Sequence, residues 1–152
     1  MKLSKDGIRL IIAYEGFRST PYICAGGKLT IGYGHVILPD EILTLKSVTH
    51  EQAQKLLERD VEAAEGAVNR EVGPTHQAIF DALISFSYNV GITAFKNSTL
   101  LRKVKAGQYR LAALEFTKWV NAGGSPLKGL IARRAEEAVM FTVGAVKCGY
   151  II

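Results

Sequence analysis

A short glycine-rich stretch with β-strand character interrupts a chain whose pattern is otherwise helical. Residues 22–36 read YICAGGKLTIGYGHV, where short apolar runs are separated by glycine turns, as in small sheets. The glycines suit turns with positive φ, and the β-like pattern ends at Pro39 and Asp40. The sequence therefore predicts an α+β fold, mainly α, with a small antiparallel sheet of two or three strands.

Helical periodicity surrounds this stretch. Apolar residues at helical spacing predict a first helix that Gly16 stops, so Glu15 lies in its last turn. Thr49 opens a capping box, THEQ, at the start of a helix expected to run to about residue 72. Further helices are expected at about 75–90, 94–106, 108–121 and 127–146.

These elements predict one domain over residues 1–152. It consists of a small β lobe at about 16–48, a connecting helix at about 49–72, and a helical lobe at about 73–152 that includes the N-terminal helix 1–15. A chain of 152 residues is long enough to bury a core of its own. We expect a ligand to bind in a cleft between the sheet and the helices.

The distribution of charge and of apolar residues along the chain argues against nucleic-acid binding and against a membrane-spanning protein. The net charge of +5 favours polyanions, but the basic residues are spread along the chain and no RNA-binding strand pattern is present, so we expect no nucleic-acid partner. The apolar run LIIAY at 10–14 is too short to cross a bilayer, and the sequence predicts neither a membrane span nor a signal peptide. Cys24 and Cys148 are expected to be two unlinked thiols.

Four residues around the β-like stretch are candidates for chemistry, although each has a structural interpretation when taken singly. A carboxylate at a helix C-terminus opposes the helix dipole, and the apolar neighbours of Glu15 would help to keep a proton on it. Thr30 suits a strand, and Cys24 suits a small buried position. His35 suits a hydrogen bond at a strand end. No two histidines have metal-ligand spacing, so we expect no metal site.

The spacing of these candidate residues along the chain is more informative than any one of them alone. Glu15 is followed after nine residues by Cys24, and Cys24 after six by Thr30, within YEGFRSTPYICAGGKLTIGYGHV. This arrangement resembles the active-site signature of phage-type lysozymes, glycoside hydrolase family 24. Other segments are similar to endolysins of that family and extend the resemblance over nearly the whole chain: RDVEAAE at 59–65, ALISFSYNVG at 82–91, FKNSTLLRKV at 95–104 and WVNAGGSPLKGLIARRAEEAVMF at 119–141.

The resemblance implies a two-lobed lysozyme-like fold and a muramidase that cleaves the β-1,4 bond between N-acetylmuramic acid and N-acetylglucosamine in peptidoglycan, with inversion. It implies that Glu15 is the general acid and that the residues at 24 and 30 hold or activate the attacking water. It also implies that Val36, Tyr88 and Ser98 bind substrate. His35 and Asp60 are implied to pair with each other and to give structural support.

The resemblance also carries expectations about biology. It implies a monomeric phage or prophage endolysin that accumulates in the host cytoplasm until lysis and then acts in the periplasm or cell wall. A separate holin-type pore would give it access to peptidoglycan. No cofactor is expected, because acid-assisted glycoside hydrolysis requires none.

The departure from the family pattern is Cys24, because most members have aspartate there. A thiol is a poor base until it ionises, and an ionised Glu15 nearby would raise its pKa further. The sequence leaves three roles open for Cys24: thiolate base, nucleophile or passive lining. It also leaves two alternative functions: a lytic transglycosylase, which needs a single acid and forms 1,6-anhydro ends, and a catalytically silent binder of peptidoglycan.

Overall fold

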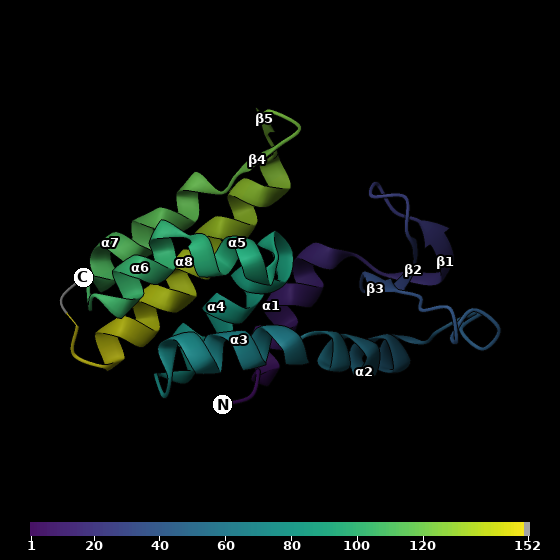
Figure 1. Cartoon of the computed structure of the whole chain (residues 1–152), viewed down its shortest axis with the longest axis horizontal. Helices are drawn as coiled ribbons and strands as arrows, with labels where there is room; N and C mark the ends of the chain where they lie inside the picture. Colours follow the sequence, from purple (N-terminus) through teal and green to yellow (C-terminus); the bar gives the residue numbers. More distant parts are fainter. Residues whose placement is uncertain (151–152) are drawn as a thin grey trace. The chain divides into compact units, whose positions relative to one another are not determined.

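The structure, a computed structural model, describes residues 1–150 and divides into two compact units (Figure 1). One unit, here called the sheet unit, is Ile11–Glu62. The other, here called the helical unit, combines Met1–Leu10 with the described residues from Ala63 onward. Helix α1 (Lys5–Glu15) contributes to both units.

The sheet unit contains a three-stranded antiparallel sheet, where the sequence predicted two or three strands. Its strands are β1 (Arg18–Ile23), β2 (Leu29–Gly32) and β3 (His35–Val36), in the order β1-β2-β3. Tyr22 pairs with Thr30, and Thr30 pairs with Val36. Because directly opposite residues of an antiparallel sheet share a face, these three side chains form a row across the sheet.

Helix α2 (His50–Asp60) packs against β2, and Gly32 makes this packing possible. Its φ is +67°, and an added Cβ would lie 2.9 Å from the Cβ of Ala53 on α2. A larger residue would therefore meet both backbone strain and a clash. The expected capping box is confirmed: the Thr49 hydroxyl accepts from the Gln52 amide at 3.1 Å, and the Gln52 side chain accepts from the Thr49 amide at 2.9 Å.

The prediction of one continuous helix over 49–72 was wrong at one residue. The chain forms α2 and then α3 (Glu62–Val72), with Val61 between them in a turn. The backbone of Val61 has ψ of −11°, which is flatter than the value near −42° of an α-helix. Nothing in the apolar spacing of this segment marks the break.

The helical unit is built around α4 (Gln77–Val90) and α8 (Lys128–Lys147), which pack against each other. Two expected helices are shorter than predicted. The segment 94–106 is divided into α5 (Ile92–Asn97) and α6 (Thr99–Lys105), while α7 (Tyr109–Glu115) ends in a 3-10 turn, Phe116–Lys118. A two-stranded hairpin, β4 (Asn121–Ala122) and β5 (Ser125–Pro126), precedes α8.

Aromatic side chains form the centre of the helical unit. Phe86 on α4 contacts the rings of Phe95, Phe116 and Trp119, the last edge-on at 5.3 Å. Edge-to-face pairs of this kind add to the stabilisation from buried apolar area. Trp119 therefore belongs at least partly to the core. Within residues 1–150, none of the helices has the length and apolar character needed to cross a bilayer.

Candidate active site

Three predicted site residues, Cys24, Thr30 and Val36, lie on one face of the sheet. Thr30, at the centre of the row, is only 2% exposed, whereas Val36 beside it is 39% exposed. Cys24 lies just beyond β1, where its amide donates to the Lys28 carbonyl at 2.9 Å and extends the strand pairing by one residue. Strand alternation therefore puts Cys24 on the same face as Tyr22 and Thr30.

The Cys24 thiol has a setting that favours its ionised form. Its pKa is lowered, first by a hydrogen bond from the Lys28 backbone amide and then by the Thr30 hydroxyl and the Gly26 amide. Donors of this kind stabilise a thiolate directly. The net direction is set by these hydrogen bonds, and the expectation that an ionised Glu15 would raise the pKa of this thiol stays a prediction.

The Thr30 hydroxyl has two possible partners for its one proton. It donates to the Lys28 carbonyl at 2.9 Å, and it also contributes to the lowered pKa of Cys24. A hydroxyl has one donor and two acceptor positions, so it serves these partners in turn. When it donates to Lys28, its oxygen is left as an acceptor on the face that carries Cys24.

Glu15 is the last residue of α1, as the sequence predicts. It is half-buried, and Gly16 turns the chain towards β1 with φ of +66°. Glu15, Cys24 and Thr30 all belong to the sheet unit. The role of Glu15 as an acid stays a prediction.

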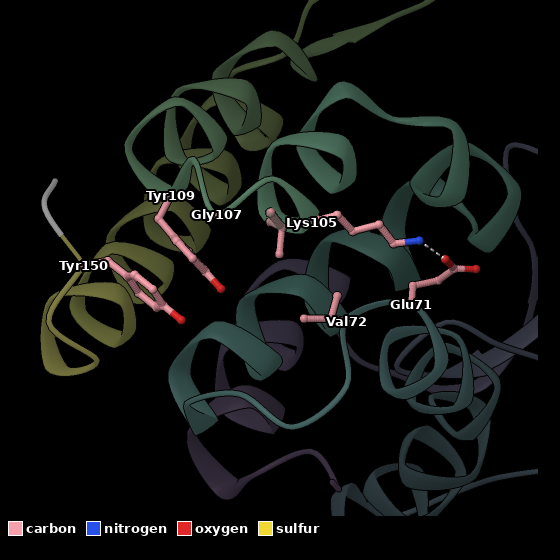
Figure 2. Close-up of a pocket in the computed structure, with 7 residues that line it drawn as sticks. Glu71, Val72, Lys105, Gly107, Tyr109 and Tyr150 are labelled. Atoms are coloured by element: carbon pink, nitrogen blue, oxygen red, sulfur yellow. Dashed lines mark hydrogen bonds and ion pairs between the residues drawn. The ribbon is translucent and has the colours of Figure 1, made fainter.

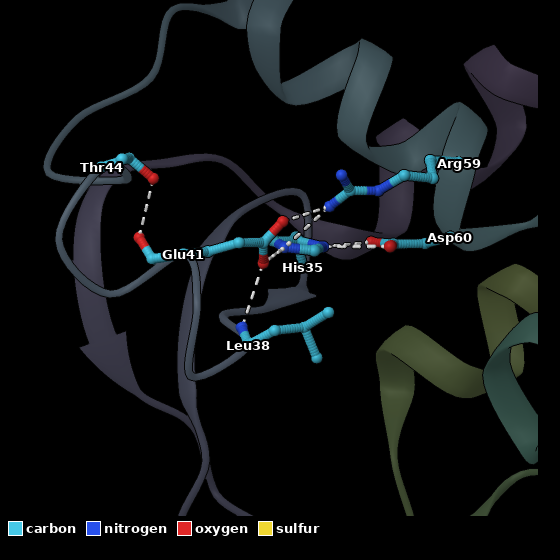
Figure 3. A network of polar contacts seen from close by, with 6 residues as sticks. All are labelled: His35, Leu38, Glu41, Thr44, Arg59 and Asp60. Atoms are coloured by element: carbon cyan, nitrogen blue, oxygen red, sulfur yellow. Dashed lines mark hydrogen bonds and ion pairs between the residues drawn. The ribbon is translucent and has the colours of Figure 1, made fainter.

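His35 connects β3 to α2 and to the loop that follows β3 (Figure 3). Its Nδ1 lies 2.8 Å from Oδ2 of Asp60, so the expected His35–Asp60 contact is present. Its Nε2 lies 2.9 Å from Oε2 of Glu41. Glu41 also accepts from the Leu38 amide at 3.0 Å and from Arg59 at 2.6 Å. Only a doubly protonated imidazole can donate to both carboxylates at once.

The pKa values of the two carboxyl groups that contact His35 are shifted in opposite directions. Hydrogen bonds from the Leu38 amide, His35 and Arg59 lower the pKa of Glu41 to about 2. Burial raises the pKa of Asp60, and its contact with His35 offsets this rise only in part. Sequence reasoning identified His35 and Asp60 but missed Glu41 and Arg59. Glu41 lies in a loop without periodicity, where no pattern marks it.

Two predicted substrate-binding residues belong to the helical unit. Tyr88 is half-buried on α4. Ser98 is buried at the N-cap of α6, where its hydroxyl donates to the Phe95 carbonyl at 2.7 Å and accepts from the Leu101 amide at 3.0 Å. These bonds give Ser98 a capping function, and its role in substrate binding stays a prediction.

Neither a metal cluster nor a disulfide adds to the site in the part of the chain that the structure describes. No group of three or more histidine, cysteine or acidic side chains in residues 1–150 could hold a metal ion. Cys24 and Cys148 are free thiols there. The predicted catalytic residues of the sheet unit offer the Glu15 carboxyl group, the Cys24 thiol of lowered pKa and the Thr30 hydroxyl.

Comparison with protein families and curated proteins gives consistent matches. Residues 12–137 match the family model described as phage lysozyme. The chain is 39% identical to an endolysin of Acyrthosiphon pisum secondary endosymbiont phage 1, covering 93% of this chain and 98% of that protein. It is 40% identical to the endolysin of Bacillus phage B103 over 97% of this chain. It spans little more than half of the Bacillus phage relatives: 56% of the B103 endolysin and 57% of that of Bacillus phage PZA.

Solved structures agree with these matches. A mutant lysozyme of phage P22 superposes with a TM-score of 0.84 at 34% identity, covering 93% of this chain and 99% of that one. The muramidase domain of SpmX from Asticaccaulis excentricus gives a TM-score of 0.81 at 37% identity, covering 92% and 97%. The α+β, mainly α, lysozyme-like fold expected from the sequence is confirmed.

Proposed function

This chain belongs to the phage lysozyme family, and from that premise we propose that it is an endolysin that hydrolyses peptidoglycan as a muramidase. The bond cleaved is the β-1,4 bond between N-acetylmuramic acid and N-acetylglucosamine. The observation that carries the chemical part of this proposal is the Cys24 thiol, whose pKa is lowered beside the buried Thr30 hydroxyl.

In the proposed reaction, Glu15 donates its proton to the glycosidic oxygen as the bond from C1 to that oxygen breaks. A water attacks C1 from the opposite face, and the Cys24 thiolate accepts one proton of that water. The products are a reducing-end sugar of inverted configuration and a free hydroxyl on the leaving sugar. The enzyme is left with a Glu15 carboxylate and a Cys24 thiol, which exchange protons with solvent before the next cycle.

Thr30 orients the water in this scheme. When its hydroxyl donates to the Lys28 carbonyl, its oxygen can accept the second proton of the water. A water held by Thr30 and Cys24 through both protons presents a lone pair to C1. Val36, exposed next to Thr30, would contact the sugar, and Tyr88 and Ser98 stay further candidates for substrate contact.

The pH dependence of turnover tests the role of Cys24. If the thiolate is the base, activity on purified peptidoglycan rises with pH as the thiol ionises. Cys24→Asp should move this rise to acid pH, because a carboxyl group ionises near 4, and Cys24→Ser should reduce the rate by about 100-fold or more. Cys148→Ser removes an exposed thiol of the helical unit and should leave the profile unchanged.

A passive Cys24 predicts a different result. In that case Cys24→Ser would keep the rate and the pH profile of the natural protein. A nucleophilic Cys24 would instead give products of retained configuration through a thioglycosyl intermediate. Proton NMR of the newly formed anomer separates this route from the inverting one.

Access to the wall is a proposal that rests on the family alone. We expect the protein to act as a monomer and to accumulate in the host cytoplasm until a holin-type pore lets it reach the periplasm or cell wall. Expression in a bacterial host with and without a co-expressed holin tests this point. Rapid lysis without any holin would contradict it.

A further inference from the structure

Only two residues, Gly16 and Phe17, connect the end of α1 to the start of β1. Gly16 has a φ of +66°, and a Cβ added to it would meet none of the described residues within 4 Å. Glycine allows more backbone conformations than other residues, and helix ends fray unless they are held. The direction in which α1 carries Glu15 therefore depends on what holds Phe17, the next residue.

The ring of Phe17 contacts both α2 and the sheet. It stacks on the imidazole ring of His50, with the centroids 3.8 Å apart and the planes 24° from parallel. Its centroid also lies 5.4 Å from that of the Tyr33 ring. Arg18 pairs with Gly32, and one residue beyond this pair come Phe17 on one chain segment and Tyr33 on the other. Because opposite residues of an antiparallel pair share a face, this register brings the two rings together.

Tyr33 and His50 hold each other in place. The Tyr33 hydroxyl lies 2.8 Å from Nδ1 of His50, and Tyr33 is buried, with 7% of its surface exposed. An imidazole nitrogen without a proton accepts from the phenol, and one with a proton donates to the phenol oxygen, so either tautomer makes this hydrogen bond. His50 is also the first residue of α2, directly after the Thr49 cap. The imidazole is thus a fixed support for the Phe17 ring, and the three residues are here called the Phe17 cluster.

An irregularity in the sheet gives the Phe17 cluster its importance. On the side of α1, Arg18 pairs with Gly32. Further along, Tyr22 pairs with Thr30, so three residues of β1 lie opposite one residue of β2. Extra residues of this kind are unpaired and bend the strand. Regular backbone pairing is therefore interrupted between the end of α1 and Thr30, and the side-chain contacts of the cluster constrain the α1 side of this interruption.

The cluster adjoins the proposed catalytic residues on both sides. Phe17 comes two residues after Glu15, and Tyr33 comes three residues after Thr30. All of them belong to the sheet unit. Inverting hydrolysis needs a fixed separation between the acid and the group that holds the attacking water, and a misplacement of about 1 Å can lower the rate by about 100-fold. Contacts that hold the end of α1 against the sheet therefore bear on the rate of the chemical step.

We propose that Phe17, Tyr33 and His50 are positioning residues that hold the Glu15 carboxyl group at the separation from Thr30 that hydrolysis needs. This inference rests on the proposed function, in which Glu15 is the acid and Thr30 orients the water. The cluster acts on the reaction through Glu15. Changes to it therefore lower kcat and leave KM nearly unchanged, because they disturb the reacting geometry and not the binding of sugar.

Steady-state kinetics on soluble peptidoglycan strands test this role, with circular dichroism to show that each variant is folded. Phe17→Leu removes the ring and keeps an apolar side chain, and it should lower kcat about tenfold or more while KM stays within about twofold. Phe17→Tyr keeps the ring and should retain at least about half of kcat. Tyr33→Phe removes only the hydroxyl group and should lower kcat about threefold or more. This last variant decides the question if Phe17→Leu does not fold.

The helical unit offers a matched control, a second stacked ring pair. Figure 2 shows Tyr109 and Tyr150, whose ring centroids are 3.8 Å apart and whose planes are 16° from parallel. Tyr150→Leu removes this stack and should change kcat by less than about twofold. The proposal would be overturned by an unchanged kcat in folded Phe17→Leu, by a rise in KM without a loss of kcat, or by an equal loss of kcat in Tyr150→Leu.

A double variant tests whether the two stacked rings act through one contact. His50→Ala removes the ring on which Phe17 stacks and should lower kcat to a similar extent as Phe17→Leu. Combining the two changes should lower kcat little further than the more severe single change, because residues in contact are coupled. Losses that multiply in the double variant would show two independent roles and overturn the cluster.

Amide hydrogen exchange gives a readout that does not depend on activity. In Phe17→Leu, the amides of residues 12–16 should exchange about tenfold or more faster than in the natural protein, while those of α4 should be unchanged. Faster exchange at 12–16, in a chain whose natural form does not lyse peptidoglycan, would support the anchoring of α1 while refuting the proposed function. Lytic activity in the natural chain, with neither exchange nor kcat altered in Phe17→Leu, would refute the positioning role alone.

Discussion

Neutralising Glu41 is expected to destabilise the protein at neutral pH and much less in acid. The side chain of Glu41 is only 14% exposed, and it bridges the loop after β3 to both His35 and Arg59. A pKa held at about 2 instead of the ordinary 4.5 corresponds to about 3 kcal/mol of stabilisation at pH 7. Because Arg59 is half-exposed, solvent screening reduces the expected value to about 1–2 kcal/mol.

The sign of the pH dependence follows from the lowered pKa. A carboxyl group that ionises more readily in the folded state stabilises the protein above about pH 4.5, and this contribution is lost as the pH falls towards 2. Glu41→Gln should therefore lower the free energy of unfolding by about 1–2 kcal/mol at pH 7. At pH 3 the difference from the natural protein should fall to less than half of that value.

Urea unfolding at pH 7, 5 and 3, followed by circular dichroism, measures this difference. Glu51→Gln is the matched control, because Glu51 forms an exposed pair with Lys55 on the same helix, and exposed pairs contribute little. It should cost less than about 0.5 kcal/mol at every pH. The reasoning would be refuted by a Glu41→Gln effect that is equal at pH 7 and pH 3, or no larger than that of the control.

Two further predictions concern stability. Gly32→Ala should lower the free energy of unfolding by about 3 kcal/mol, because it combines positive φ with a clash against Ala53. Gly27 also has a positive φ but has open space around it, so Gly27→Ala should lower the free energy of unfolding by only about 1 kcal/mol. If Gly32→Ala and Gly27→Ala lose the same free energy in denaturant unfolding, the packing argument is contradicted. Ser98→Ala should cost about 1 kcal/mol through the lost cap of α6, and a thermal melt equal to that of the natural protein would refute the capping role.

Much of the sheet unit could be predicted from local sequence signals. Glycine placement and alternation predicted a small antiparallel sheet of two or three strands, and the structure has three. Gly16 predicted the end of α1 at Glu15, and the THEQ capping box predicted the start of α2. These features depend on interactions within a few residues, which the sequence pattern records directly. The contact between His35 and Asp60 came from the family resemblance instead.

Features that depend on tertiary contacts could not be predicted in this way. Glu41 reaches His35 and Arg59 from an irregular loop, and no periodicity fixes the position of such a residue. The lowered pKa of Cys24 depends on how the turn folds its amides back onto the thiol. The break at Val61 and the burial of Ser98 similarly reflect packing rather than local propensity.

We propose that this chain hydrolyses peptidoglycan with Glu15 as the acid. Mass spectrometry of muropeptides released from purified peptidoglycan by the natural protein, Glu15→Gln and Cys24→Ser, all under reducing conditions, tests it most directly. We expect muropeptides with ordinary reducing ends from the natural protein and almost none from either variant. Muropeptides with 1,6-anhydro ends, or undiminished release by Glu15→Gln, would contradict it.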